Sequence, residues 1–340
     1  MPELHPSDQS EPGIVRRRRG RGFSYEGPDG RPVRDPATLR RIRSLVIPPA
    51  WKDVWICPSP YGHLQAVGTD AAGRRQYRYH DLWREQQDRA KFDHVLEVAE
   101  RLPAFRKAVD DRLKGRGLTR DRVLAAAARL LDIGFFRIGG ESYDTYGLAT
   151  LRMEHVACRN GLVTCSYQAK GDIPREVEVA DPGACAVLRS LKALGAEGEL
   201  LRYRHKEGGW GDVRSEDINE YLRELVGCEV SAKDFRTWHA TVLAAVGLAV
   251  SKHAGSKRAG ANGQARKRAV TRVMREVAEY LGNTPTVARA SYVDPRVVEA
   301  YDQDRTIAAV LTELGADTDY GQLATHGTVE RAVIDLIRAV

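Results

Sequence analysis

The sequence lacks the features that would indicate disulfides, metal sites or nucleotide binding. Its five cysteines are odd in number and widely spaced, with no C-x-x-C pair, which argues against a disulfide framework and a zinc site. Its nine histidines form no H-x-x-H or H-x-x-x-H ligand pattern, and no G-x-x-x-x-G-K-[ST] phosphate loop occurs. We therefore expect no metal and no cofactor.

Long apolar segments are also missing. The longest apolar or near-apolar run covers residues 241–250, about half of the roughly 20 residues that a bilayer crossing needs. Residues 1–15 contain prolines and acidic residues, without the apolar core of a secretory signal. These absences predict a cytoplasmic protein that does not associate with membranes.

What the sequence does have is length and positive charge. Its 340 residues, 42% of them hydrophobic, suffice for about two domains with packed cores. The net charge of +7 is uneven: residues 15–80 hold 14 Lys and Arg against five Asp and Glu, and residues 251–272 hold seven against none. Such basic zones suit a polyanion, because neutralising phosphates releases condensed counterions. A solvated basic surface is an equally good interpretation.

Three regions of the chain differ in pattern. Residues 1–20, which include the run Arg16–Arg19, are typical of a disordered tail. Residues 21–84 contain short strand-like runs separated by Pro and Gly turns, so a β-rich domain is expected there. From residue 85 onward the apolar residues recur at helical spacing, which predicts a mostly helical domain over residues 85–340. The predicted fold class is α+β.

One predicted strand of the first domain interleaves cations, an amide and aromatic residues. Its sequence is Gly73-Arg74-Arg75-Gln76-Tyr77-Arg78-Tyr79-His80. Alternation would place Gln76, Arg78 and His80 on one face and the two tyrosines on the other. Such a strand can offer donors to phosphates, an amide that suits adenine, and hydroxyls for a nucleic-acid backbone. The alternative is a mixed edge strand with its tyrosines in the core.

A β passage interrupts the helical domain. A strand should end at Arg159, Asn160-Gly161 is a type I′ turn signal, and strands are expected over residues 162–169 and 176–179. The turn between the last two contains Lys170. The helical domain should therefore contain a small three-stranded sheet with Lys170 at a hairpin tip, where a long cationic side chain can reach into a groove. Exposed hairpin lysines often serve only solubility.

Two arginines of the helical domain are candidates for binding an anion. Arg137 follows the aromatic pair Phe135-Phe136 at a helix end. Arg236 lies in the first turn of a helix that begins with the capping box of residues 231–234, where a guanidinium suits a phosphate. The structural alternatives are an arginine that pairs with the last carbonyls of its helix for Arg137, and a surface arginine for Arg236.

Residues 281–295 contain the candidate nucleophile, Tyr292. A helix from about Arg266 should stop at Gly282-Asn283, and Thr284-Pro285 has the form of an N-cap and first position of a new short helix. Asp294-Pro295 repeats that signal. Tyr292 thus lies between two helix breaks, where its side chain can point at a ligand. The alternative is a half-buried packing tyrosine with a solvated hydroxyl.

Arg137, Lys170, Arg236 and Tyr292, which lies nine residues after Asn283, resemble in their order the active-site set of type IB DNA topoisomerases. The resemblance is closest to the poxvirus-like bacterial branch. Three N-terminal segments also resemble the DNA-facing part of that family: Ile47-Pro48-Pro49-Ala50-Trp51, Gly62-His63-Leu64-Gln65-Ala66 and residues 73–80. The matching pieces cover residues 20–300.

Two positions depart from the family pattern. Asn283 stands where many members have histidine, although the bacterial branch commonly has asparagine there. An imidazole can become charged, whereas an amide donates only a neutral hydrogen bond. Gly140 stands where poxvirus members tend to have a lysine that contacts DNA, so one phosphate contact would be absent.

The resemblance implies an enzyme that nicks one strand of duplex DNA through a 3′-phosphotyrosyl link at Tyr292. The cut strand would rotate and be rejoined, without ATP or metal. Arg137 and Arg236 would neutralise the phosphodiester and its transition state, and Asn283 would donate one more hydrogen bond. Lys170 would protonate the leaving 5′ oxygen.

The resemblance also implies which residues contact DNA, and where in the cell the protein acts. Tyr143 matches a family tyrosine that touches DNA, and the same role falls to Arg74, Arg75, Gln76, Tyr77, Arg78 and Tyr79. Double-stranded DNA is the expected partner, clamped by a monomer associated with the nucleoid. One alternative is a tyrosine recombinase, although recombinases usually show His-x-x-Arg where this chain has Lys233-x-x-Arg236, and they lack the β-rich front domain. The other is a non-catalytic DNA-binding clamp.

Overall fold

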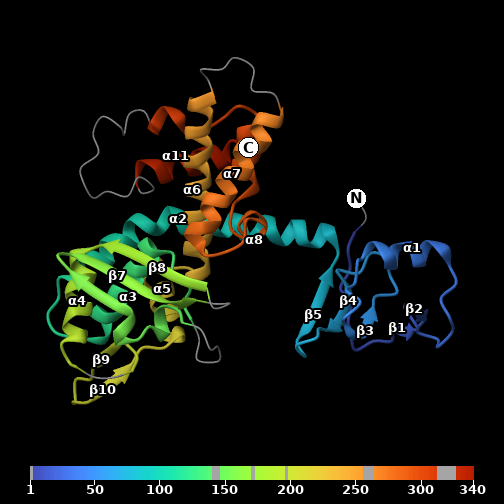
Figure 1. The fold of residues 1–340 in the computed structure, drawn as a ribbon, viewed down its shortest axis with the longest axis horizontal. Helices are drawn as coiled ribbons and strands as arrows, with labels where there is room; N and C mark the ends of the chain where they lie inside the picture. Colours follow the sequence, from blue (N-terminus) through green and yellow to red (C-terminus); the bar gives the residue numbers. More distant parts are fainter. Residues whose placement is uncertain (1–2, 140–145, 170–172, 196–197, 256–262, 312–326) are drawn as a thin grey trace. The chain divides into compact units, whose positions relative to one another are not determined.

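A computed structural model describes residues 3–139, 146–169, 173–195, 198–255, 263–311 and 327–340. The chain divides into two compact units, Met1–Phe92 and Asp93–Val340 (Figure 1). The division falls inside helix α2 (Asp81–Leu113), eight residues beyond the boundary expected at residue 84. In the parts of the chain that the structure describes, no helix combines the length and apolar character needed to cross a membrane.

The first unit is a five-stranded antiparallel sheet covered by one helix. The strand order is β2 (Gly22–Glu26), β1 (Ile14–Arg19), β3 (Lys52–Ile56), β4 (Leu64–Thr69) and β5 (Arg75–Tyr79). Helix α1 (Pro36–Ser44) begins at the N-cap Asp35, whose carboxylate accepts from Thr38 N–H. Its buried Ile42 packs against Ile14 and Ile56 of the sheet. The predicted β-rich first part is confirmed.

The predicted disordered tail is wrong for residues 14–19, which form strand β1. Ile14 at its start is 3% exposed. Arg16 donates to the carbonyls of Pro48 and Trp51 at 3.1 and 2.7 Å, and its guanidinium lies 4.2 Å from the ring centroid of Phe23. The strand was missed because four consecutive arginines show no alternation of apolar and polar residues, although β1 forms a hairpin with the next strand, β2, through the turn at Gly20-Arg21.

The second unit contains the predicted three-stranded sheet. Strands β6 (Val156–Arg159), β7 (Leu162–Ala169) and β8 (Ile173–Ala180) pair antiparallel in that order. Asn160 and Gly161 have φ values of 52° and 80°, as a type I′ turn requires. A further hairpin of β9 (Arg202–Arg204) and β10 (Trp210–Asp212) was not predicted, because three-residue strands are too short to show alternation.

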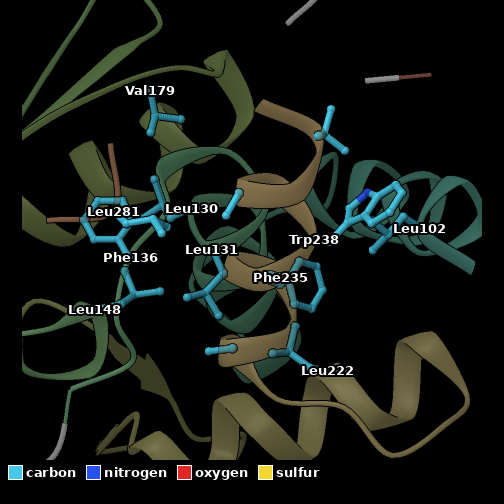
Figure 2. Packing of buried hydrophobic residues seen from close by; sticks show 14 of the residues in the cluster. Leu102, Leu130, Leu131, Phe136, Leu148, Val179, Leu222, Phe235, Trp238 and Leu281 are labelled. Carbon is cyan, nitrogen blue, oxygen red and sulfur yellow. The ribbon is translucent and has the colours of Figure 1, made fainter. Parts of the chain in front are cut away.

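Helices form the rest of the second unit. They are α3 (Arg120–Gly134), α4 (Pro182–Lys192), α5 (Ser215–Val226), α6 (Ala232–Gly255), α7 (Gly263–Leu281), α8 (Pro285–Ser291), α9 (Pro295–Asp302) and α11 (Thr328–Arg338), with two 3₁₀ turns at Leu148–Thr150 and Met153–His155. Helix α3 is central, since nearly its whole length is buried. Figure 2 shows its Leu130 and Leu131 among side chains of α2, α5, α6 and β8. The predicted α+β class is confirmed.

A charged cluster fixes the C-terminal helix to this core. Arg106 of α2 donates to Asp132 of α3 at 2.8 and 3.0 Å, and to Glu330 of α11 at 2.6 and 2.9 Å. Trp238 of α6 also donates to Glu330, at 2.8 Å. Both carboxylates are almost completely buried. The cluster therefore joins four helices by charge-assisted hydrogen bonds.

Candidate active site

The turn that leads to Tyr292 is built as its sequence predicts. Gly282 follows α7 with φ of +61°, and the N–H groups of Gly282 and Asn283 donate to the carbonyls of Glu279 and Ala278 at 3.1 and 2.9 Å. This pairing is the Schellman motif that ends helices at glycine. Thr284 then caps α8, with Pro285 at its first position, and Asp294 caps α9. The expected helix breaks are confirmed.

Tyr292 is the C-cap residue of α8, and helix α6 holds its backbone. The hydroxyl oxygen of Thr241 lies 3.2 Å from the carbonyl oxygen of Tyr292 and accepts from Asp294 N–H at 3.1 Å. Thr241 itself is buried. The side chain of Tyr292 is half-buried against the core. Its backbone is thus fixed by the same helix that carries Arg236.

Arg236 lies beside Tyr292 and is buried. It is 3% exposed, so the surface alternative is wrong. Its guanidinium carbon is 5.4 Å from the ring centroid of Tyr292. Its Nη1 donates to the carbonyl of Phe135, and its Nη2 donates to the carbonyl of Leu281 at 2.8 Å. Two backbone carbonyls from separate segments therefore orient the guanidinium.

Arg137 reaches the same turn from the end of α3. Phe135 leaves that helix in the left-handed conformation, with φ of 55°, and Phe136 is fully buried, which anchors Arg137 next to it. Arg137 Nη2 donates to the carbonyl of Gly282 at 3.0 Å and to Oδ1 of Asn283. The expected alternative was pairing with the last carbonyls of its own helix. The carbonyl it contacts belongs to the end of α7 instead.

These positive charges change the acidity of the site. Burial lowers the pKa of Arg236 to about 10, and Arg137 acts in the same direction, whereas Tyr292 opposes it. For Tyr292, burial alone would raise the pKa. The nearby charges of Arg236, Arg137 and Lys233 outweigh burial, so the pKa of the phenol lies below its usual value. The phenol is therefore easier to ionise than a tyrosine in water.

Two buried donors of the site lack a hydrogen-bond acceptor within the described ranges. They are Nε of Arg236 and Nδ2 of Asn283. The orientation of the Asn283 amide follows from chemistry, because Arg137 can only donate and must face the amide oxygen. Leaving a buried donor unsatisfied costs about 1–3 kcal/mol. A site with two such donors beside guanidiniums is suited to an anion.

The predicted DNA-contacting strand is β5, an edge strand of the first unit. Tyr77 and Tyr79 are 46% and 36% exposed and stack on each other at 6.2 Å, so the alternative that buries them in the core is wrong. Gln76 donates to Asp70 at 2.9 Å. Of the other predicted contact residues, Arg74 forms an ion pair with Asp70 and Arg75 donates to Gln9. Arg78 is half-buried.

Three residues singled out in the sequence lie outside the described residues: Gly140, Tyr143 and Lys170. The structure brings Tyr292, Arg236, Arg137 and Asn283 together at the end of α7. It also places there a residue that sequence reasoning missed, Arg175 of β8, which donates to the carbonyl of Tyr280 at 2.6 Å. Little in the sequence indicates this role, since Arg175 lies just before the strand expected at residues 176–179 and a single arginine there is typical of a solvent-exposed position.

The sequence matches two protein-family models and a viral relative. Residues 80–314 match the family described as eukaryotic DNA topoisomerase I, catalytic core. Residues 22–70 match the bacterial DNA topoisomerase IB N-terminal domain. The DNA topoisomerase 1B of Acanthamoeba polyphaga mimivirus is 27% identical over 301 residues, which are 86% of this chain and 88% of the viral protein.

Solved structures give a much weaker likeness. A XerH site-specific recombinase bound to palindromic difH substrate, in a post-cleavage complex, aligns with a TM-score of 0.37 and 16% identity. The alignment covers 59% of this chain and 50% of the recombinase. The pre-cleavage complex of XerH aligns with a TM-score of 0.34. Likeness at this level supports no conclusion about function.

The chain belongs to the DNA topoisomerase I family, whose catalytic core accounts for most of its length. Within that family it is a type IB enzyme with an N-terminal domain of the bacterial kind. The resemblance predicted from the sequence is confirmed. The match to the topoisomerase I catalytic core favours this family over the tyrosine recombinase alternative.

Proposed function

We propose that this enzyme relaxes supercoiled double-stranded DNA by cutting one strand through Tyr292, letting the cut strand rotate and rejoining it. One observation carries the assignment of the nucleophile. Tyr292 lies beside the buried guanidinium of Arg236, at a site where Nε of Arg236 and Nδ2 of Asn283 lack acceptors within the described residues. A phosphodiester supplies the acceptors that those two donors need.

In the proposed cleavage step, the phenolate oxygen of Tyr292 attacks the phosphorus and forms a 3′-phosphotyrosyl bond. The bond from phosphorus to the 5′ oxygen breaks, and Lys170 gives that oxygen a proton. The lowered pKa of Tyr292 favours loss of the phenolic proton. Arg236, Arg137 and Asn283 stabilise the added negative charge of the transition state through preorganised donors. Religation reverses each step, so the bond energy is conserved in the covalent link.

Neither ATP nor a metal ion has a role in this proposal. The covalent link stores the energy that religation needs, and guanidiniums supply the positive charge that the phosphate requires. Purified protein is therefore expected to relax positive and negative supercoils in EDTA without ATP. A strict requirement for Mg²⁺ or ATP would refute this part of the proposal. Activity should fall steeply with salt, since binding depends on phosphate contacts.

The decisive test is replacement of the nucleophile. Tyr292→Phe removes one hydroxyl, so relaxation and the SDS-stable DNA adduct should disappear while non-covalent DNA binding persists. A denaturing gel with end-labelled duplex measures the adduct. Tyr301, 7% exposed on α9, provides the matched control as Tyr301→Phe. If Tyr292→Phe still forms the adduct, another tyrosine is the nucleophile, and if wild type forms none, the non-catalytic clamp is the better assignment.

The proposed role of Lys170 has its own test. If Lys170 protonates the 5′ oxygen, its importance should depend on the basicity of the leaving group. A strand with sulfur at that bridging position leaves as a thiolate, whose conjugate acid has a pKa of about 8.5, taking cysteine as the reference. Lys170→Ala should cleave ordinary DNA slowly and the sulfur-bridged strand at nearly the wild-type rate. Equal defects on both substrates would show that Lys170 holds DNA and donates no proton.

A further inference from the structure

The backbone carbonyls at the end of α7 point to a residue outside the proposed catalytic set. A helix leaves its last carbonyls without partners inside the helix. In α7, the N–H groups of Gly282 and Asn283 satisfy the carbonyls of Glu279 and Ala278. The next three carbonyls in sequence, those of residues 280–282, need donors from elsewhere.

Each of these three carbonyls accepts a hydrogen bond from a different arginine. Arg175 Nη2 donates to Tyr280 at 2.6 Å, Arg236 Nη2 to Leu281 at 2.8 Å, and Arg137 Nη2 to Gly282 at 3.0 Å. The three side chains come from β8, from α6 and from the segment after α3. The negative end of the α7 dipole offsets the repulsion among the three cations. Two of these arginines belong to the proposed catalytic set, and Arg175 does not.

Arg175 also covers the turn that carries Asn283. A methyl group on Gly282 would lie 2.8 Å from Nη1 of Arg175, so the guanidinium packs directly on the glycine. A pocket of about 180 Å³ adjoins this contact and is lined by Arg175, Arg137, Tyr146 and Gly282, among others. Arg175 therefore connects strand β8 to the turn from one side, while Arg137 connects the end of α3 to it from another.

We infer that Arg175 is a positioning residue for DNA cleavage, which holds the turn at residues 280–282 so that Asn283 and Arg137 keep their geometry toward the phosphate. Arg175 donates to the backbone carbonyl of Tyr280 and also hydrogen-bonds the side chain of Tyr167, so it links strand β8 to the turn that carries Asn283. The inference rests on the proposed function of the site. Small misplacements of catalytic groups are costly, since a shift of about 1 Å can lower a rate about 100-fold.

The first test compares two identical substitutions in one sheet. Arg175→Met removes the donor and keeps the chain length, and Arg159→Met is the control on β6, where Arg159 is exposed. Single-turnover adduct formation is measured on a nicked duplex, from which the short fragment that carries the freed 5′ hydroxyl dissociates after cleavage. Arg175→Met should slow cleavage by about 10- to 100-fold, with DNA affinity and its salt dependence unchanged. Arg159→Met should cleave at the wild-type rate.

The second test separates positioning from general stability. If part of the effect of Arg175 passes through Asn283, the double variant Arg175→Met with Asn283→Ala should lose less rate than the product of the two single losses, because coupled residues are non-additive. Arg175→Lys keeps a donor for the Tyr280 carbonyl and should regain part of the lost rate. Thermal unfolding of each variant identifies any that fails to fold, and for such a variant Arg175→Lys carries the test.

Three results would overturn the inference. The first is a wild-type cleavage rate in Arg175→Met, and the second is fully additive losses in the double variant. The third is weaker DNA binding by Arg175→Met with a reduced salt dependence, which would make Arg175 a phosphate contact. The first of these leaves the proposed function intact, because the adduct still forms. Absence of the adduct in the wild-type protein would overturn the proposed function and this inference together.

Discussion

Arg106 and Arg236 are two largely buried arginines of the same unit, and their surroundings are opposite. Arg106 is held by the carboxylates of Asp132 and Glu330. Arg236 donates to the backbone carbonyls of Phe135 and Leu281, and no described carboxylate forms an ion pair with it. Burial lowers the pKa of both guanidiniums, but the carboxylates raise that of Arg106 above its usual value, whereas that of Arg236 falls to about 10.

The difference shows how one residue type serves structure or chemistry. Carboxylates orient a guanidinium and also cancel its charge, so the Arg106 cluster has no charge left for a ligand. Carbonyls orient a guanidinium and leave its full charge, which remains available to an anion. The cost is an uncompensated buried charge. Arg137 follows the same scheme, since its described partners are a carbonyl and an amide oxygen.

The largest expected effect is on the stability of the Arg106 cluster. Arg106→Met leaves Asp132 and Glu330 buried without their counter-charge, so the free energy of unfolding should fall by about 3–5 kcal/mol. Denaturant unfolding measures this loss. Cleavage per folded molecule should remain near wild type at low temperature, because the site itself is unchanged. A variant as stable as wild type would contradict the structural role of the cluster.

Arg236→Ala should have the opposite effect: a large loss of cleavage rate and a smaller loss of stability. Loss of one preorganised donor typically costs about 10²- to 10³-fold in rate, and single-turnover cleavage measures it. The loss in unfolding free energy should be smaller than for Arg106→Met, because no buried carboxylate loses its counter-charge. If Arg236→Ala unfolds as readily as Arg106→Met and still cleaves DNA, then Arg236 serves the fold and not the reaction.

The stability that the Arg106 cluster contributes should also depend on pH. Burial alone would raise the pKa of Asp132, but hydrogen bonds from His239 and Arg106 hold it far below its usual value. A depressed carboxyl pKa contributes stability that is complete above the unfolded value of about 3.9 and is lost as pH falls below it. Below that pH, the free energy of unfolding should therefore fall less steeply with decreasing pH in Arg106→Met than in wild type. Identical pH slopes would contradict this.

The smallest effect concerns the exposed tyrosines of β5. Tyr77 and Tyr79 are open to solvent and their hydroxyls support no fold contact that the structure describes. Tyr77→Phe should leave stability within about 0.5 kcal/mol of wild type and weaken DNA binding by about 0.5–1.5 kcal/mol, the value of one hydrogen bond. Binding titrations measure this. A clear loss of stability would show that the hydroxyl serves the fold.

Local chemistry made several elements predictable. Gly282 ends α7 because few other residues adopt a φ of +61°, and Thr284-Pro285 begins α8 because the hydroxyl and the ring both suit a first turn. Asn160-Gly161 determines its turn in the same way. Each of these features depends on one or two neighbouring residues. The sequence could therefore predict where the chain turns around Tyr292.

The sequence alone determined the family, the helix breaks around Tyr292 and the candidate set that includes Arg137 and Arg236. Only the tertiary structure decided that residues 14–19 form a strand, that Arg236 is buried, and that Arg175 joins the other two arginines. For the three arginines, the physical reason is separation along the chain. These arginines meet carbonyls that lie 45, 105 and 145 positions away in sequence, and contacts over such distances exist only once the helices and the small sheet have packed.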